Sequence, residues 1–436
     1  MTLAGVLEAD LTWTGEAFES GIQIRLGEDG RIAEVGRLGL PPTHRLAGRA
    51  LLPGFVSAHS HAFQRGLRGR GERFPAGSGS FWTWREAMYG LVGSLDADTF
   101  QSLCERTFRE MRRAGVTTVG EFHYFHHGPG EDGWAFDERV LRAASTAGIR
   151  IALLEVYYRT GAIGQPLEGA QRRFGTPSPA AYWEQMDRLA GLLAPDLQSL
   201  GASVHSIRAA SLDDLKDVYD EARRRDLVFH IHVEEQIREI EDALAYYGKR
   251  PMQLLLESLG TATDLTAVHC THTHPEDMER FLAGGGTVCI CPLTEANLGD
   301  GIAGLPFVQE RRGAVCLGSD SNARISPLEE MRWLEYGQRL STQSRGVLRD
   351  DGGEVARTLL HAGTLAGARS LGVEAGQIAP GAWADLAAID LTAPTLAGWE
   401  PDTLLDALIF GAAEEAIAAT CVGGDWEESP PSGRAA

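Results

Sequence analysis

The 436-residue sequence is poor in lysine and carries an excess of acidic charge. Lys216 and Lys249 are its only lysines, so arginine supplies almost all of the positive charge. Acidic residues outnumber basic residues by 60 to 40, which gives a formal net charge of -20 at pH 7. This balance argues against a nucleic-acid-binding protein and against attachment to an anionic membrane. An anionic ligand must therefore be held by arginines placed close to it.

Paired cysteines and long apolar segments are also missing. The six cysteines are scattered, and none of them forms a Cys-x-x-Cys pair. Several lie in apolar, strand-like segments, which favours buried free thiols. The first residues contain neither a basic segment nor a long apolar stretch, so we expect no signal peptide and no transmembrane span. These features together predict a cytoplasmic location.

The middle of the chain, residues 51–372, alternates short apolar segments with stretches of helical periodicity. This alternation is typical of a parallel α/β fold. Eight strands are predicted, the number that a closed (β/α)8 TIM-like barrel requires. They cover residues 50–56, 117–122, 150–156, 202–204, 228–232, 265–268, 287–291 and 314–318.

Residues 1–50 and 373–436 have a different character, with short strands separated by turns. Residues 22–35 form two alternating segments around an Asp29-Gly30 turn, which predicts a hairpin. Residues 386–389 and 416–422 are apolar and strand-like. We therefore predict a small β-sandwich domain built from both termini, beside the barrel.

A His-x-His pair ends the first barrel strand. In an extended chain, residues i and i+2 point to the same side, so His59 and His61 can converge on one point. Two neutral imidazoles there suit zinc or a similar divalent ion. An isolated pair of this kind is about as often a pair of ordinary surface or core histidines, so the pattern needs support from the rest of the chain.

That support comes from the other strands, because polar side chains follow most of them. In a barrel the carboxyl ends of all strands open on one face, which carries the chemistry. Residues far apart in the sequence should therefore meet in one pocket. The side chains in these positions are Glu121, Tyr124, His205, Arg208, His232, Glu235, His269 and Asp320.

Three imidazoles and a carboxylate are available to one cation: His59, His61, His232 and Asp320. A zinc ion bound in such a site lowers the pKa of a coordinated water to about 7. Many two-metal enzymes of this architecture use a modified lysine at the end of the fourth strand. Neither Lys216 nor Lys249 occupies such a position, so we expect one divalent metal ion per subunit, with zinc as the expected ion.

Glu235 follows His232 by three residues and has the right chemistry to move a proton between a water and a leaving nitrogen. Taken alone, Glu235 would be interpreted as a solvated acid on the first turn of a helix. His269 and Asp320 are further candidates for hydrogen bonds to that water. A second His-x-His pair, His272 and His274, is interpreted as structural.

Four segments of the sequence resemble the amidohydrolase superfamily, and in particular its one-metal deaminase branch. They are PGFVSAHSH (53–61), HVEE (232–235), VH (268–269) and GSDS (318–321). Within this branch the chain is similar to the formimidoylglutamate deiminases. The narrower similarity lies in HSHAFQR (59–65), SFWTWRE (80–86), HSIRA (205–209) and HIHVEEQ (230–236).

The resemblance implies hydrolysis of N-formimino-L-glutamate to N-formyl-L-glutamate and ammonia, a step of histidine degradation, in a homodimer. It implies that zinc is held by His59, His61, His232 and Asp320, with Glu235, His269 and Asp320 as catalytic groups. It also implies a substrate pocket that uses Gln64, Arg85, Tyr124, His205 and Arg208. The last implication agrees with the chemistry, because the substrate has two carboxylates and guanidinium groups bind carboxylates bidentately.

Two alternatives stay open at this level. One is an aminohydrolase that acts on guanine or a similar ring on the same fold. Such an enzyme needs a flat pocket, and Arg85 and Arg208 argue against it. The other is a non-catalytic scaffold stabilised by metal, against which the presence of both Glu235 and His269 argues.

Overall fold

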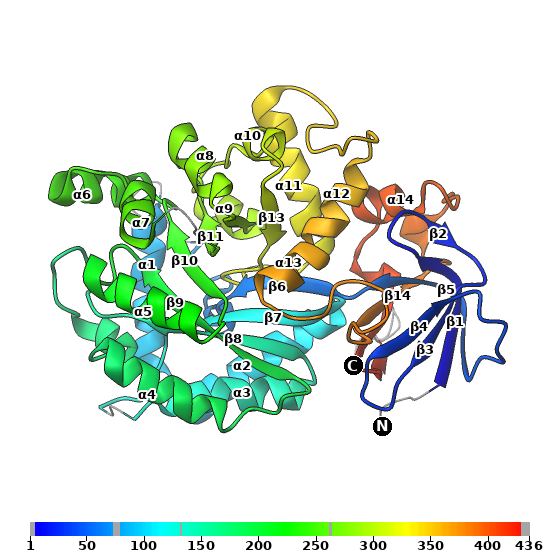
Figure 1. Ribbon diagram of the computed structural model, residues 1–436, viewed down its shortest axis with the longest axis horizontal. Helices are drawn as coiled ribbons and strands as arrows, with labels where there is room; N and C mark the ends of the chain where they lie inside the picture. Colours follow the sequence, from blue (N-terminus) through cyan, green and yellow to red (C-terminus); the bar gives the residue numbers. More distant parts are fainter. Residues whose placement is uncertain (1–4, 73–78, 131–132, 261–263, 429–436) are drawn as a thin grey trace.

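The computed structural model describes residues 5–72, 79–130, 133–260 and 264–428. A parallel barrel with surrounding helices occupies one side of the molecule, and a mixed sheet lies beside it (Figure 1). The N-terminal strands, coloured blue, and the C-terminal elements, coloured orange to red, come together in that second part. Both predicted parts of the fold are therefore confirmed.

The barrel consists of eight parallel strands that pair in the order in which they occur along the chain. An isolated parallel bridge between Ser60 and Asp320 brings the first strand against the end of the last. The strands are β6 (Phe55–Ser60), β7 (Val116–His123), β8 (Arg150–Tyr157), β9 (Gln198–Ser206), β10 (Phe229–Val233), β11 (Thr266–His269), β12 (Thr287–Ile290) and β13 (Ala314–Leu317).

Helices cover the outside of the barrel, and their apolar residues explain why. In α2 (Ala97–Arg113), Phe100, Leu103, Phe108 and Met111 recur at helical spacing and are buried, while the charged side chains other than the buried Arg112 face outward. Strands β6, β7, β8, β10 and β11 are buried along their whole length, as expected for a parallel sheet covered on both faces.

The other α-helices in the described ranges follow in chain order. They are α1 (Phe81–Ser94), α3 (Ala135–Ala147), α4 (Pro179–Ala190), α5 (Leu212–Arg224), α6 (Ile237–Tyr247), α7 (Pro251–Leu259), α8 (Pro275–Ala283), α9 (Pro292–Leu298), α10 (Leu305–Glu310), α11 (Pro327–Thr342), α12 (Val355–Ala362), α13 (Leu365–Ser370) and α14 (Leu404–Gly411). Short 3-10 helices are η1 (Ala62–Leu67), η2 (Gly169–Phe174), η3 (Pro394–Leu396) and η4 (Glu414–Ala416).

The second sheet combines strands from both ends of the chain. Its order is β16-β15-β14-β5-β1-β3-β4, and β2 pairs with β1 outside this path. The hairpin expected around Asp29-Gly30 is the antiparallel pair of β3 and β4. The strands are β1 (Gly5–Trp13), β2 (Phe18–Glu19), β3 (Gln23–Leu26), β4 (Ile32–Gly36), β5 (His44–Pro53), β14 (Leu386–Asp390), β15 (Ile417–Val422) and β16 (Asp425–Glu428).

The apolar segment 50–56, predicted as one strand, is divided between the two sheets. Its first part belongs to β5 in the terminal sheet, and its second part belongs to β6 in the barrel. Gly54 lies between the two strands. The position requires glycine, because a Cβ here would lie 2.2 Å from the side chain of Thr117. The domain boundaries expected from the sequence, between residues 50 and 51 and between residues 372 and 373, remain a prediction.

A buried ion pair joins the barrel to the terminal sheet. Arg150 at the start of β8 donates from Nε and Nη2 to the two carboxylate oxygens of Asp385, at 2.7 and 3.0 Å. The backbone N–H of Gly423 donates to Asp385 as well, at 2.7 Å.

All six cysteines are buried free thiols, as predicted. No helix in the described ranges is both long enough and apolar enough to cross a membrane.

Candidate active site

Three imidazoles and one carboxylate converge at the carboxyl ends of the barrel strands. The Nε2 atom of His59 lies 3.2 Å from that of His61 and 3.0 Å from that of His232. Asp320 Oδ1 lies 3.3 Å from His61 Nε2 and 3.6 Å from His59 Nε2. The structure thus brings together all four residues that the sequence predicts as metal ligands, and all four are buried.

The closure of the barrel places these groups. His59 and His61 lie at the end of β6, two residues apart, as expected for an extended chain. The backbone N–H of His61 donates to Asp320 O at 2.9 Å, and the N–H of Ser319 donates to His59 O at 3.0 Å. The backbone contacts between the first and last strands therefore set the distance between Asp320 and the imidazoles.

Gly318 and Asn322 allow this close approach and hold it. A Cβ on Gly318 would lie 2.8 Å from both Cβ and the carbonyl oxygen of His59, so a side chain there would displace the histidine. The side-chain amide of Asn322 donates to the carbonyl oxygens of Asp320 and His61, at 3.0 and 3.1 Å. Asp320 itself has a φ of 43°, which is unusual for a residue with a Cβ and is common at functional sites.

The protonation of the imidazoles fits a cation. The Nδ1 atoms of His61 and His232 donate to the carbonyl oxygens of Phe122 and His205, at 2.9 and 3.0 Å. In a neutral imidazole only one nitrogen carries a proton, so the Nε2 atoms of both rings present lone pairs to the same point. Burial lowers the pKa of His59 to about 3 and also lowers the pKa of His61, which favours neutral rings.

The set of donors fits a divalent metal ion on these grounds. Lone pairs of imidazoles repel one another unless a cation lies between them, and three nitrogens with one carboxylate oxygen is a ligand set typical of zinc. Although burial alone would raise it, contacts with His59, His61 and His269 hold the pKa of the Asp320 carboxyl below its usual range. Asp320 is therefore a carboxylate, as a ligand must be.

A fourth histidine and two acids lie beside the donors. His269 directs Nε2 toward Asp320 Oδ2, at 3.8 Å, while its Nδ1 lies 3.3 Å from Oε1 of Glu295. Burial would lower the pKa of His269, but the carboxylates of Glu235, Glu295 and Asp320 raise it to about 10. Glu295, on α9, is a site residue that the sequence analysis did not identify.

Glu235 is buried and lies just before α6 rather than on its first turn, so the interpretation of Glu235 as a solvated acid on a helix is wrong. The preceding residue, Glu234, has a φ of 53°, which turns the chain sharply after β10. Burial raises the pKa of Glu235 above its usual value, with a further contribution from Asp320 that the charge of His269 opposes. A buried acid with a raised pKa beside a pocket is suited to proton transfer.

Three of the four donors line a pocket: His61, His232 and Asp320. The empty space of this pocket, including its mouth, is about 550 Å³. All five residues predicted to bind substrate line this pocket. They are Gln64, Arg85, Tyr124, His205 and Arg208.

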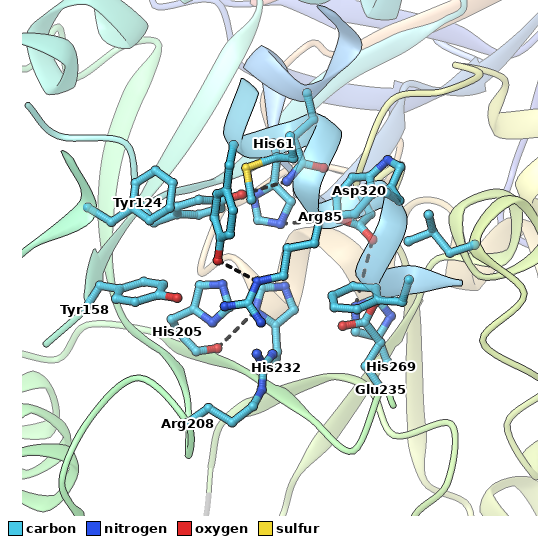
Figure 2. Close-up of a pocket in the computed structure, with 17 residues that line it drawn as sticks. His61, Arg85, Tyr124, Tyr158, His205, Arg208, His232, Glu235, His269 and Asp320 are labelled. Carbon is cyan, nitrogen blue, oxygen red and sulfur yellow. Dashed lines mark hydrogen bonds and ion pairs between the residues drawn. The ribbon is translucent and has the colours of Figure 1, made fainter. Parts of the chain in front are cut away.

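Two arginines from different elements reach into this pocket. Figure 2 shows Arg85, from α1, and Arg208, from the loop after β9, extending toward the same region opposite Asp320 and His269. Arg85 Nε donates to the hydroxyl of Tyr89 at 2.5 Å, and that hydroxyl also accepts from Gln171 at 2.9 Å. The pocket thus combines a group of metal donors with two guanidinium groups.

The remaining polar groups are also held in place. Gln64 Nε2 donates to the hydroxyl of Tyr124 at 2.7 Å. Burial, followed by the charge of Arg208, lowers the pKa of His205 well below the usual value, so this ring is neutral. Tyr89 and Tyr158 line the pocket too, and the sequence analysis missed both, because tyrosines in apolar segments give no signal that distinguishes them from core residues.

A second buried group of histidines and acids lies behind β7 and β8. His126 Nδ1 is 3.1 Å from Asp137 Oδ1 and 3.3 Å from Glu155 Oε1, and its Nε2 donates to Val156 O at 2.9 Å. His123 donates from Nε2 to the same oxygen of Asp137, at 3.0 Å. Each contact here joins a nitrogen to an oxygen, whereas the first group brings imidazole nitrogens face to face. Both carboxylate oxygens of Glu155 lack a hydrogen-bond partner among the described residues.

Comparisons with known proteins agree with this geometry. A model of the amidohydrolase family matches residues 50–426. A formimidoylglutamate deiminase from Pseudomonas aeruginosa is 38% identical over 419 residues, 94% of this chain and 92% of that protein. The crystal structure of an amidohydrolase from Brucella melitensis is 31% identical, with a TM-score of 0.89, and the match covers 98% of this chain and 96% of that one. An adenosine deaminase from Xanthomonas campestris with bound zinc is similar in fold, with 23% identity, a TM-score of 0.81 and coverage of 97% and 92%.

Proposed function

The chain belongs to the amidohydrolase family, and we propose that it hydrolyses N-formimino-L-glutamate to N-formyl-L-glutamate and ammonia. The observation that carries this proposal is the presence of Arg85 and Arg208 in the pocket that the metal donors line. The substrate is a dicarboxylate with an amidine at one end. Two guanidinium groups match its carboxylates, and the donors lie where the amidine would react.

His59, His61, His232 and Asp320 would hold one divalent ion, for which zinc suits the ligand set best. When bound, this ion supplies a water that is acidic enough to lose its proton near neutral pH. The relative from Xanthomonas campestris contains zinc in a similar fold, which supports this choice.

We also propose that the protein is a homodimer, as the resemblance implies, and that it is cytoplasmic, as the six free thiols suggest. Sedimentation velocity would test the dimer.

Glu235 is proposed to carry the proton. Because its pKa is raised, it can accept a proton from the attacking water and hold it until the nitrogen departs. The amidine carbon has two nitrogens, and hydrolysis must release ammonia rather than glutamate. Delivery of the proton to the terminal nitrogen is therefore the step that selects the product.

The other groups bind and orient the substrate. We propose that Arg208 holds one carboxylate and that Arg85, with Tyr124, holds the other. Gln64 and the neutral imidazole of His205 would orient the formimino group with their hydrogen bonds. His269, whose Nδ1 contacts Glu295, directs Nε2 toward Oδ2 of Asp320 and would stabilise the charge that develops on the attacking water.

A substrate panel tests the proposal against a ring aminohydrolase. Ammonia release is measured with N-formimino-L-glutamate, guanine, adenosine and cytosine at matched concentrations. The proposal predicts that kcat/KM for N-formimino-L-glutamate exceeds that for each ring by several orders of magnitude, because a ring offers no pair of carboxylates to the arginines. Turnover of a ring without turnover of N-formimino-L-glutamate would refute it.

A further inference from the structure

Arg208 faces a buried carboxylate that is not among the metal donors. Its Nε atom lies 3.7 Å from Oε1 of Glu239, and both side chains are buried. Among the described residues, the Nε atom of Arg208 has no hydrogen-bond partner, and neither carboxylate oxygen of Glu239 has one. A buried carboxylate without hydrogen bonds is costly, so Glu239 depends on the charge of Arg208 for its stabilisation.

The electrostatics of the pair agree with this dependence. Burial would lower the pKa of Arg208, but the Glu239 carboxylate raises it above its usual value. Burial raises the pKa of Glu239 to about 7, and Arg208 is the largest influence that opposes this rise. Each charge is therefore the main partner of the other.

In each of the two pocket arginines the Nε atom faces a polar side chain, and the two side chains differ in charge. Arg85 Nε is bound by the neutral hydroxyl of Tyr89, one helical turn further along α1. Arg208 Nε faces a carboxylate instead. Because a guanidinium group is planar, fixing Nε on one side leaves the two terminal amino groups on the other, in the geometry that binds a carboxylate bidentately.

Glu239 is also placed by the element that follows Glu235. It lies in the first turn of α6, where its backbone N–H donates to Gln236 O at 3.0 Å, and a carboxylate near a helix N-terminus is stabilised by the helix dipole. Glu235 and Glu239 lie four residues apart, on either side of the start of the helix. One short segment thus carries the proposed proton-transfer acid and the partner of the proposed carboxylate anchor.

We propose that Glu239 is a positioning residue that holds Arg208 by its Nε atom, so that the terminal amino groups of Arg208 face a carboxylate of the substrate. This inference rests on the proposed function, because it assigns Glu239 to the binding of a dicarboxylate. Without Glu239, the guanidinium group keeps its charge but loses its orientation. The cost should appear in substrate binding rather than in the chemical step.

A double-mutant cycle tests the inference. The variants are Glu239→Leu, Arg208→Met and the two combined, with Glu239→Gln as a conservative variant that keeps the volume and an acceptor oxygen. We expect Glu239→Leu to raise KM for N-formimino-L-glutamate roughly tenfold or more, with a smaller change in kcat, and Glu239→Gln to recover part of the loss. The combined variant should have the KM of Arg208→Met alone, because Glu239 acts only through Arg208.

The control is Glu241→Gln, an exposed acid on the same helix, which should leave KM and kcat unchanged. Thermal unfolding and metal content of each variant show whether it is folded. An unchanged or lower KM in both Glu239 variants, or effects that add in the combined variant, overturns the inference alone. A wild-type enzyme that does not turn over N-formimino-L-glutamate refutes the proposed function, and the inference with it.

Discussion

His59 and His232 lie 173 positions apart in the sequence, and their Nε2 atoms face each other at 3.0 Å. His59 lies near the end of β6 and His232 lies in β10, so the curvature of the barrel brings them together. The proposed chemistry depends on this convergence.

Glu235→Gln tests the proposed path of the proton. The amide keeps the size of the side chain but cannot carry a proton between water and nitrogen, so kcat should fall by roughly 10²- to 10⁴-fold. Metal content and the melting temperature should stay close to those of the wild type, because Glu235 is not among the metal donors. Near-normal turnover would remove Glu235 from the mechanism.

Arg85→Met and Arg208→Met test the carboxylate anchors. Each should raise KM for N-formimino-L-glutamate roughly 10- to 100-fold, because each removes charge-assisted hydrogen bonds to one carboxylate. Arg109→Met is the matched control and should change neither constant, because Arg109 pairs with Glu105 and with the carbonyl oxygen of Thr146 and is not among the residues that line the pocket. If KM is unchanged in both pocket variants, the carboxylates bind elsewhere.

The buried His126–Glu155 pair predicts a loss of stability at alkaline pH. Burial would lower the pKa of His126, but Asp137 and Glu155 raise it from 6.5 to about 10. Burial and Asp137 raise the pKa of Glu155 from 4.5 to about 8. Groups whose pKa is higher in the folded state stabilise it at low pH and lose that contribution as the pH rises through the folded pKa.

The melting temperature of the wild type should therefore fall between pH 7 and pH 10, and Glu155→Gln should show a smaller fall. Circular dichroism at several pH values measures both. His274→Asn, at an exposed position, serves as the control and should follow the wild type. Parallel curves for the wild type and Glu155→Gln would contradict this assignment.

Arg150→Met tests the connection between the barrel and the terminal sheet. It leaves Asp385 buried without its cation, which should lower the free energy of unfolding by about 3–5 kcal/mol. Denaturant unfolding measures the change. Arg25→Met removes a pair that is exposed on both sides and should change stability by about 1 kcal/mol or less. Equal effects of the two variants would show that the buried pair has no special role.

The sequence was sufficient to predict the barrel, the terminal sheet and the positions of the polar groups that meet in the pocket. Strands β7 and β8 were predicted within one residue of their observed ends, because each combines apolar and β-branched residues with a polar residue near its carboxyl end. Pro53-Gly54 is a turn signal inside residues 50–56, but a turn signal does not show that the two halves of an apolar segment join different sheets, so this division could not be predicted.

Glu239 and Glu295 show what a single sequence conceals. Both are acids on helices, where most acids are solvated, and nothing in their local sequence marks them as buried. Their roles depend on contacts with Arg208 and His269, which come from other elements. The sequence pattern identified polar residues that follow strands, such as Arg208 and His269. It did not identify the helical residues that contact them, Glu239 and Glu295.

The most direct test of the account is metal analysis and turnover measured on the same purified sample, for the wild type and for His232→Asn. We expect one divalent ion per chain in the wild type, loss of ammonia release from N-formimino-L-glutamate in proportion to the metal removed by a chelator, and recovery when zinc is added back. His232→Asn should retain little metal and little activity. Full turnover in metal-free wild-type protein, or undiminished metal content in His232→Asn, would contradict the account.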